Sequence, residues 1–291
     1  MNNIWPKKQT EWINNGVLYV SIPFTWNLPE VKNRLQWTAK AWSRAVVGGP
    51  AVDLMPDFFD GMDHVSVGHC MPGVLQRVNP MATRTTVGCI RHCKYCAIGT
   101  GKVEPGGLRC LDDWPDLPVI CDNNLLAAPM DHFEKVINRL KKHHEVDFNQ
   151  GIDSRLLTGA HAEMIASLKM KKRGIRLALD SMAYSDSWGR AFDILRSAGI
   201  AKRNISTYAL IGFDSDPAEA WSRCKWIEDH GIRALPMWFH ALDQLQRNIV
   251  TKRQSELGWT DFERRRIMQW FYQHKNAVNH NSAGLRQAAL F

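Results

Sequence analysis

The chain has 291 residues, of which 45% are hydrophobic and 23% are charged. This composition supports a full apolar core and excludes a globally disordered protein. No apolar run reaches the roughly 18 residues that span a bilayer, and the N-terminus lacks the pattern of a signal peptide. We therefore expect a cytoplasmic protein with no membrane partner. In that compartment, clustered cysteines more often bind metal than form disulfides.

The formal net charge is +8 at neutral pH. A basic surface attracts polyanions, so nucleic acid or a nucleotide is a possible substrate. Two basic runs, at 169–173 and 264–266, could bind phosphates, but such runs are more often solvated helix faces. Charge by itself leaves both interpretations open.

The first 80 residues are expected to form a small α/β segment with a connector. The run VLYVSI (17–22) is apolar and β-branched, which predicts a buried strand. A helical pattern follows it, and VVGGPAV (46–52) predicts a second short strand broken by glycine and proline. Residues 53–80 contain scattered proline, glycine and aspartate, and we expect them to connect this segment to the next.

Between residues 81 and 250, short apolar runs alternate with helical patterns. Strands are predicted at 85–87, 118–122, 146–151, 175–180, 205–212 and 232–239. Apolar strands separated by helices predict a parallel sheet covered on both faces. The expected fold class is therefore α/β, with six units forming a partial (βα)6 TIM-like barrel. Residues 251–291 would add a helical C-terminal extension.

Two of the predicted helix starts carry side-chain signals. Asp131 with Glu134 predicts an N-terminal cap, in which the aspartate accepts a hydrogen bond from the backbone. Asp216 followed by Pro217 predicts another helix start, because proline favours the first helical position. Both signals place a helix between two predicted strands, as the alternating pattern requires.

The run GCIRHCKYC (88–96) is the most informative about chemistry. Its three thiolates can converge only if the loop wraps around a common centre. A structural zinc site normally takes four protein ligands, and no histidine or cysteine lies at a finger-like distance to supply the fourth. Three thiolates suit a four-iron cluster with one iron left open for a chelating ligand. A zinc site and three unrelated cysteines remain the alternatives.

The spacing of Cys89, Cys93 and Cys96, with Tyr95 just before the last cysteine, resembles the radical S-adenosylmethionine superfamily. The resemblance extends over about residues 81–245. It implies that the three cysteines hold a [4Fe–4S] cluster and that S-adenosylmethionine is reductively cleaved there. The 5′-deoxyadenosyl radical would then abstract hydrogen from a substrate. It also implies an electron donor such as flavodoxin or ferredoxin, and contact between Tyr95 and the adenine.

The resemblance further implies cofactor or substrate contacts at the carboxyl ends of the predicted strands. After the second strand the family usually has Gly-Gly-Glu, which binds the methionine amino group. Asp122, Asn123 and Asn124 stand there instead, and their oxygens can accept from an ammonium. The other expected contacts are Asn149, Gln150, Asp153, Asp180, Ser181, Ile211 and Gly212. Asn149 and Asp180 could equally be helix caps or turn residues.

The N-terminal segment resembles the domain that precedes the barrel in cobalamin-binding subfamilies. The run VGGPAV carries this resemblance, but no Asp-x-His-x-x-Gly signature for cobalamin ligation is present. The resemblance thus implies a reduced domain without the cofactor. The methylthiotransferase branch is disfavoured because its extra N-terminal cysteines are missing.

Cys121 lies at the end of the predicted strand 118–122. There it could donate a hydrogen atom to a substrate radical as a catalytic residue, although a buried structural thiol is the other interpretation. A function from a different class also stays open: a non-catalytic nucleic-acid-binding protein with a structural metal site.

Overall fold

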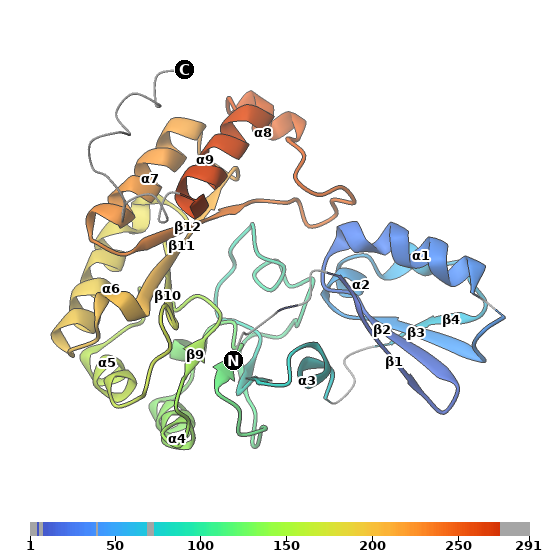
Figure 1. The fold of residues 1–291 in the computed structure, drawn as a ribbon, viewed down its shortest axis with the longest axis horizontal. Coiled ribbons are helices and arrows are strands. Elements are labelled where there is room, and N and C mark those ends of the chain that lie inside the picture. Colours follow the sequence, from blue (N-terminus) through green and yellow to red (C-terminus); the bar gives the residue numbers. More distant parts are fainter. Residues whose placement is uncertain (1–4, 6–7, 39, 69–72, 274–291) are drawn as a thin grey trace. The chain divides into compact units, whose positions relative to one another are not determined.

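The computed structural model describes residue 5 and residues 8–38, 40–68 and 73–273 as a mixed α/β protein (Figure 1). The chain divides into two compact units. Unit 1 consists of Met1–Gln150, Ser167–Lys169 and His240–Asn248, and unit 2 of Gly151–Ala166, Met170–Phe239 and Ile249–Phe291. Within the described ranges, every helix is too short or too polar to cross a membrane.

Unit 1 begins with a four-stranded sheet. Its strands are β1 (Thr10–Asn14), β2 (Val17–Ser21), β3 (Arg44–Gly48) and β4 (Val65–Val67). β1 and β2 form an antiparallel hairpin, whereas β2, β3 and β4 are parallel. Asn15 and Gly16 close the hairpin with φ angles of 49° and 74°. Asn-Gly is favoured in such two-residue turns because both central residues need positive φ.

Two helices cover one face of this sheet. α1 (Leu28–Trp37) and α2 (Pro50–Leu54) share an apolar core with alternating residues of β2 and β3. The strand predicted at 17–22 is confirmed. The strand predicted at 46–52 is confirmed only up to Gly48, because Gly49 turns the chain with a φ of 95° and α2 begins at once.

The expectation that residues 53–80 form a plain connector was wrong. This range contains β4 and also α3 (Val74–Val78). β4 has three residues and α3 has five, and elements this short produce no recognisable hydrophobic period.

A second sheet of unit 1 contains the parallel strands β5 (Ala82–Thr83), β8 (Val119–Ile120) and β9 (Asp147–Phe148). The short strand expected at 85–87 is confirmed, but it does not join the parallel sheet. β6 (Thr86–Val87) pairs antiparallel with β7 (Arg109–Cys110) instead. The Asp122 carboxylate accepts the backbone N–H groups of Thr85 and Thr86, so those donors do not extend the parallel ladder.

α4 (Met130–Leu140) follows β8 and buries the apolar face that the sequence predicted. The expected cap at Asp131 was wrong. The helix begins one residue earlier, after Pro129, and no side chain caps it. Asp131 is therefore already in the first turn, where its carboxylate accepts from the His132 N–H and lies favourably at the positive end of the helix dipole.

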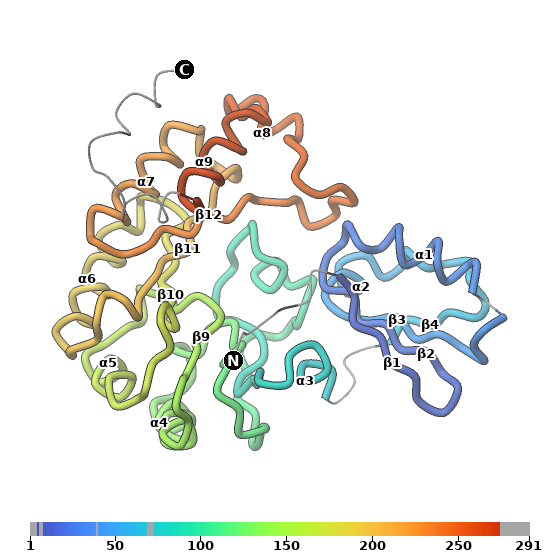
Figure 2. The backbone as a smooth tube through the Cα atoms, in the orientation of Figure 1, coloured from blue at the N-terminus to red at the C-terminus, as the bar shows by residue number. Residues whose placement is uncertain are grey.

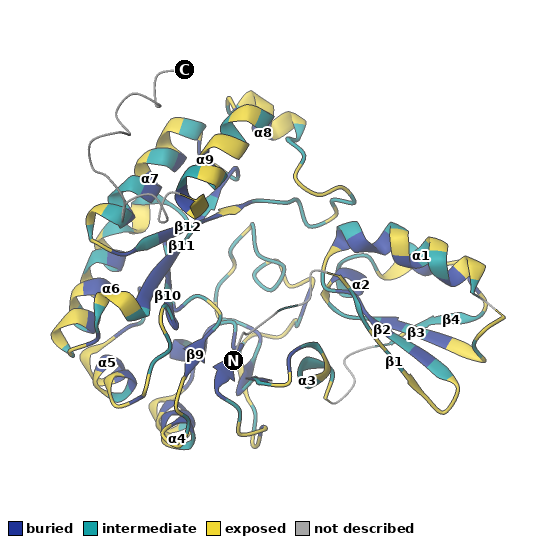
Figure 3. Ribbon diagram, in the orientation of Figure 1, coloured by how far each residue is buried: buried dark blue, intermediate teal, exposed yellow. Residues whose placement is uncertain are grey.

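Unit 2 is built on the parallel strands β10 (Ile175–Ala178), β11 (Ile205–Ile211) and β12 (Arg233–Trp238). Figure 3 shows β11 as largely buried. The α-helices of unit 2 are α5 (Gly159–Ala166), α6 (Ser185–Ser197), α7 (Pro217–Asp229), α8 (Lys252–Glu256) and α9 (Asp261–Gln273). The three strands predicted here are confirmed. So is the helix start at Asp216, whose side chain accepts from the Glu219 N–H at 2.8 Å.

The parallel strands belong to two separate three-stranded sheets, β5-β8-β9 and β10-β11-β12. A mixed α/β fold is thus confirmed, but a single six-stranded sheet is not, and the described residues form no closed barrel. The expected helical extension is observed as α8 and α9; its last residues, 274–291, lie outside the described ranges.

Candidate functional site

The three cysteines lie in the long loop between β6 and β7, residues 88–108. Figure 2 shows this stretch, by its colour, as irregular backbone. Cys89, Cys93 and Cys96 are all free thiols and are half-buried. The Cys96 N–H donates to the Cys93 carbonyl at 3.1 Å, and the Thr100 N–H donates to the Cys96 carbonyl at 2.9 Å. These bonds turn the chain tightly between the second and third thiols.

Two glycines allow the loop to close on itself. Gly88 has a φ of 82°, and a Cβ there would lie 1.9 Å from the Gly107 carbonyl oxygen. A Cβ on Gly99 would lie 2.5 Å from the Cys93 nitrogen. In both cases the obstacle is backbone, which cannot move aside as a flexible side chain would. Only glycine therefore fits at these two positions, one just before Cys89 and the other three residues after Cys96.

The Cys89 sulfur has two donors near it. The Arg91 N–H lies 3.4 Å from Sγ, and the Asn124 side-chain amide lies 3.6 Å from it. Burial raises the pKa of the Cys96 thiol, and the neighbouring Cys93 and Cys89 thiols raise it further. The structure thus places Asn124 beside the first cysteine.

Glu104 holds together three parts of this region. Its carboxylate forms a bidentate pair with Arg84, accepts from the Gly88 N–H at 2.9 Å and accepts from the Asn123 amide at 2.9 Å. Burial disfavours the charged carboxylate, but the hydrogen bonds and charge of Arg84 outweigh it and lower the pKa of Glu104. Sequence reasoning missed Glu104 and Arg84, because they lie twenty positions apart in irregular chain that has no periodic signal.

Asp122 is a buried carboxylate among the expected cofactor contacts, with 4% of its surface exposed. One oxygen accepts from the Thr85 and Thr86 N–H groups at 2.6 and 2.9 Å, and the other accepts from the Thr85 hydroxyl at 2.6 Å. Burial raises the pKa of this carboxyl, against the opposing effect of these bonds. Asp122 therefore ties the end of β8 to the start of the cysteine loop, and its contact with a cofactor stays a prediction.

The remaining candidates of unit 1 lie at the ends of β8 and β9. The Asn149 side chain accepts from the Trp5 indole N–H at 3.2 Å. Cys121 is buried in an apolar cluster with Ala82 and Val119, which is the environment of a structural thiol. Tyr95 is half-buried within the loop, and Gln150 is exposed after β9.

In unit 2, two of the expected contacts have local structural partners. Asp153 accepts from the Arg155 guanidinium at 2.7 and 3.1 Å. The Ser181 hydroxyl accepts from the Ala183 N–H at 3.3 Å and caps the short helical turn Met182–Tyr184. Both side chains shape the chain after a strand, so their predicted contact with the cofactor has no support from their geometry.

The ends of β10 and β11 are joined by a residue that sequence reasoning missed. Arg223 on α7 is 1% exposed and donates to the backbone carbonyls of Asp180 and Leu210. Ile211 is buried, and a Cβ on Gly212 would lie 2.5 Å from the Trp238 ring. The glycine is thus required for packing. The sequence signal that could have found Arg223 is its position: it is a charged residue next to the apolar residues that α7 buries.

The three thiols of the run 88–96 match, in type and number, the ligands of an iron–sulfur cluster held by three cysteines. No group of three histidine, cysteine, aspartate or glutamate side chains surrounds a single metal-ion position within the described part of the chain. A [4Fe–4S] cubane takes one thiolate at each iron that the protein ligates, so its cysteines need not meet at one point. Cys89, Cys93 and Cys96 are free, half-buried and held in a loop that only glycines allow.

No protein-family model and no curated protein matches this chain. Its site is therefore defined by its own geometry. In unit 1 the cysteine loop, Glu104, Asn123 and Asn124 form one connected set through the hydrogen bonds described above.

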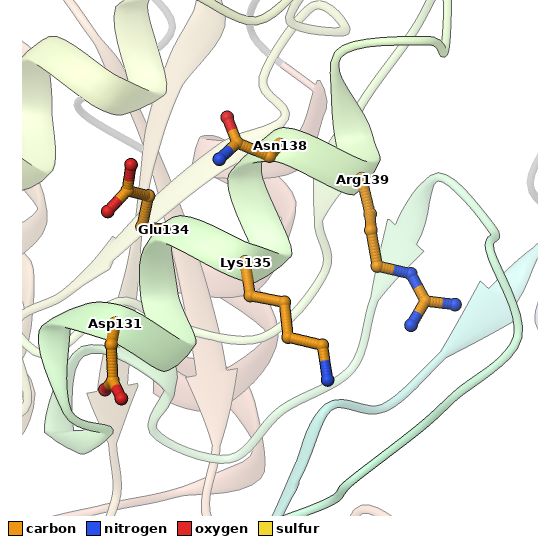
Figure 4. A pocket seen from close by; sticks show the side chains of 5 residues that line it. All are labelled: Asp131, Glu134, Lys135, Asn138 and Arg139. Atoms are coloured by element: carbon orange, nitrogen blue, oxygen red, sulfur yellow. The ribbon is translucent and has the colours of Figure 1, made fainter.

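A surface hollow of about 580 Å³ lies on α4 (Figure 4). It is lined by Asp131, Glu134, Lys135, Asn138 and Arg139. The cations of Lys135 and Arg139 lie 4.9 and 4.5 Å from the centre of the Trp114 ring. These two cation–π contacts hold the segment around Trp114 against α4. None of the three cysteines lines the hollow.

The basic run on α9 is largely neutralised by its own helix. Arg264 and Arg265 pair with Asp261, and Arg266 pairs with Glu263. These pairs favour the interpretation as a solvated helix face over that of a phosphate site.

Proposed function

We propose that the protein is a radical S-adenosylmethionine enzyme in which Cys89, Cys93 and Cys96 hold a [4Fe–4S] cluster. The observation that carries the proposal is the cysteine run itself, with three free, half-buried thiols in a loop closed by glycines. When bound, the cluster would cleave S-adenosylmethionine reductively and supply a 5′-deoxyadenosyl radical. A partial (βα)6 barrel is part of this proposal.

The chain's own residues would orient this loop and bind the cofactor. Glu104 fixes the start of the loop through the Gly88 N–H. The Asn124 amide donates toward the Cys89 sulfur at 3.6 Å and would orient it as a cluster ligand. The Tyr95 ring would contact the adenine, and polar groups such as Asn123 would bind the methionine part.

The proposed reaction draws electrons from a donor such as flavodoxin or ferredoxin. A reducing compartment, the cytoplasm, would keep the three thiols available as ligands. The net charge of +8 also favours a second candidate, a non-catalytic nucleic-acid-binding protein whose cysteines hold a structural metal.

Anaerobic reconstitution with iron and sulfide tests the proposal. The wild-type protein should bind about four irons per chain and, with dithionite, convert S-adenosylmethionine to 5′-deoxyadenosine. The variant with Cys89, Cys93 and Cys96 changed to Ala should do neither. Cys110→Ala, which removes an exposed free thiol outside the run, should do both.

Full retention of iron in the triple variant would contradict the proposal. Stable binding of zinc in place of iron, with no 5′-deoxyadenosine, would favour the second candidate.

A further inference from the structure

The four-stranded sheet of unit 1 has two different faces. α1, α2 and the buried side chains of β2 and β3 form the core on one face. Strand alternation and register assign the other face to Thr10, Trp12, Asn14, Val17, Tyr19, Ser21, Arg44, Val46, Gly48 and Ser66. None of these residues is acidic, and none belongs to that core cluster. We call this second surface the open face.

The open face carries a stacked aromatic pair. Trp12 on β1 and Tyr19 on β2 lie opposite each other, with ring centroids 5.4 Å apart and planes within 9°. Both rings are half-buried and therefore partly accessible. Their mutual stacking holds them in one orientation, which lowers the entropy lost when a further ring packs on them.

Two exposed arginines accompany the aromatic pair. The Arg77 guanidinium from α3 lies 5.0 Å from the centre of the Trp12 ring. Arg44 on β3 donates from Nε to the Ser66 hydroxyl at 3.0 Å. Neither arginine forms an ion pair with another residue in the described ranges, in contrast to the arginines of α9. Their charge is available to an anionic partner.

We infer that the open face binds single-stranded nucleic acid. Aromatic rings stack on unpaired bases, and guanidinium groups bind phosphates without regard to sequence. A duplex keeps its bases stacked inside and cannot present them to the rings. The absence of acidic residues on the face and the net charge of +8 suit a polyanion better than a second copy of this basic chain. The inference goes beyond the proposed function and does not depend on it.

Fluorescence anisotropy with the full-length protein tests the inference. The probes are a labelled mixed-sequence single strand of about 15 nucleotides, as DNA and as RNA, and the duplex of the same sequence. We expect the single strand to bind more tightly than the duplex. Trp12→Leu should weaken binding about tenfold, the size of one lost base–aromatic stack. Trp37→Leu is the matched control, since that side chain is 89% exposed on the end of α1, away from the open face.

A second variant tests the charges and leaves both aromatic rings in place. Arg44→Gln with Arg77→Gln removes two exposed cations, so the slope of log affinity against log salt should become shallower by about 1.4. Circular dichroism checks that each variant remains folded. No binding of single strands, equal binding of duplex, or unchanged affinity and salt slope in both variants would overturn the inference.

Light scattering measures the oligomeric state and so tests whether a second copy of the chain occupies the open face instead. A dimer that Trp12→Leu dissociates would show that the open face pairs with a second copy and would also overturn the inference. The outcome is separable from the proposed function. The variant lacking Cys89, Cys93 and Cys96 should keep its affinity for single strands, and 5′-deoxyadenosine formation without oligonucleotide binding would reject this inference alone.

Discussion

The cysteine loop of unit 1 and the strand ends of unit 2 use polar residues in different ways. In the cysteine loop, Glu104 and Asp122 are connected to backbone groups far away in the sequence. At the strand ends of unit 2, Asp153 and Ser181 bond to residues two positions away. Long-range bonds position a loop relative to a sheet, whereas local bonds only shape a turn.

This difference separates candidate site residues from residues that merely follow strands. Polar residues at strand ends look alike in a sequence, and both regions were expected to contact one cofactor. In unit 1 such residues connect to the cysteines, through Asn124 and through Glu104 with Gly88. Three substitutions, each with a matched control, test whether the two regions differ in this way.

Gly88→Ala should have the largest effect. The new Cβ would meet the Gly107 carbonyl oxygen at 1.9 Å, in addition to the strain of a φ of 82°. The loss of stability should exceed the about 1–2 kcal/mol that left-handed backbone costs a residue with a Cβ, and reconstituted iron should fall with it. Urea unfolding and iron analysis are the measurements.

Gly101→Ala is the control for Gly88→Ala. Gly101 has a φ of 72°, but a Cβ there would meet no atom within 4 Å. This variant should lose only about 1–2 kcal/mol and retain iron. Equal losses in the two variants would mean that the close approach to Gly107 does not shape the loop.

Arg223→Met tests the strand ends of unit 2. The substitution keeps an apolar stem but removes the donors to the Asp180 and Leu210 carbonyls, leaving both without this partner. We expect a loss of about 3 kcal/mol of stability, measured by calorimetry. Arg253→Met removes an exposed pair with Asp214 and should cost less than about 1 kcal/mol. A smaller loss for Arg223 than for Arg253 would contradict its role as the link between the two strands.

Glu104→Gln should have the smallest effect, and one that depends on pH. The pKa of Glu104 is lowered in the folded protein, so its charge stabilises the fold above the unfolded pKa of about 4.3. This stabilisation is lost as the pH falls through the lowered folded pKa. The difference between wild type and variant in urea midpoint should therefore be present at neutral pH and shrink in acid. Glu256→Gln on the exposed α8 serves as the control, and a difference that grows in acid would refute the assignment.

Much of the fold could be predicted from the sequence because long elements carry a strong hydrophobic period. β11, β12 and the start of α7 lie close to their predicted positions. The hairpin at Asn15 and Gly16 was missed although Asn-Gly is a strong turn signal. The two-residue strands β5 and β7 were missed, because two residues establish no period.

The sequence by itself determined the cysteine spacing, the alternation of apolar strands and helices, and the cap at Asp216, whose partner lies three residues away. Those properties depend on local geometry, which neighbouring residues specify. The tertiary structure decided which polar groups meet. Arg84 reaches Glu104, Asp122 takes the amides before β6, and Arg223 joins two strand ends. Such contacts depend on how separate segments pack together. Residue type and spacing along the chain do not specify that packing.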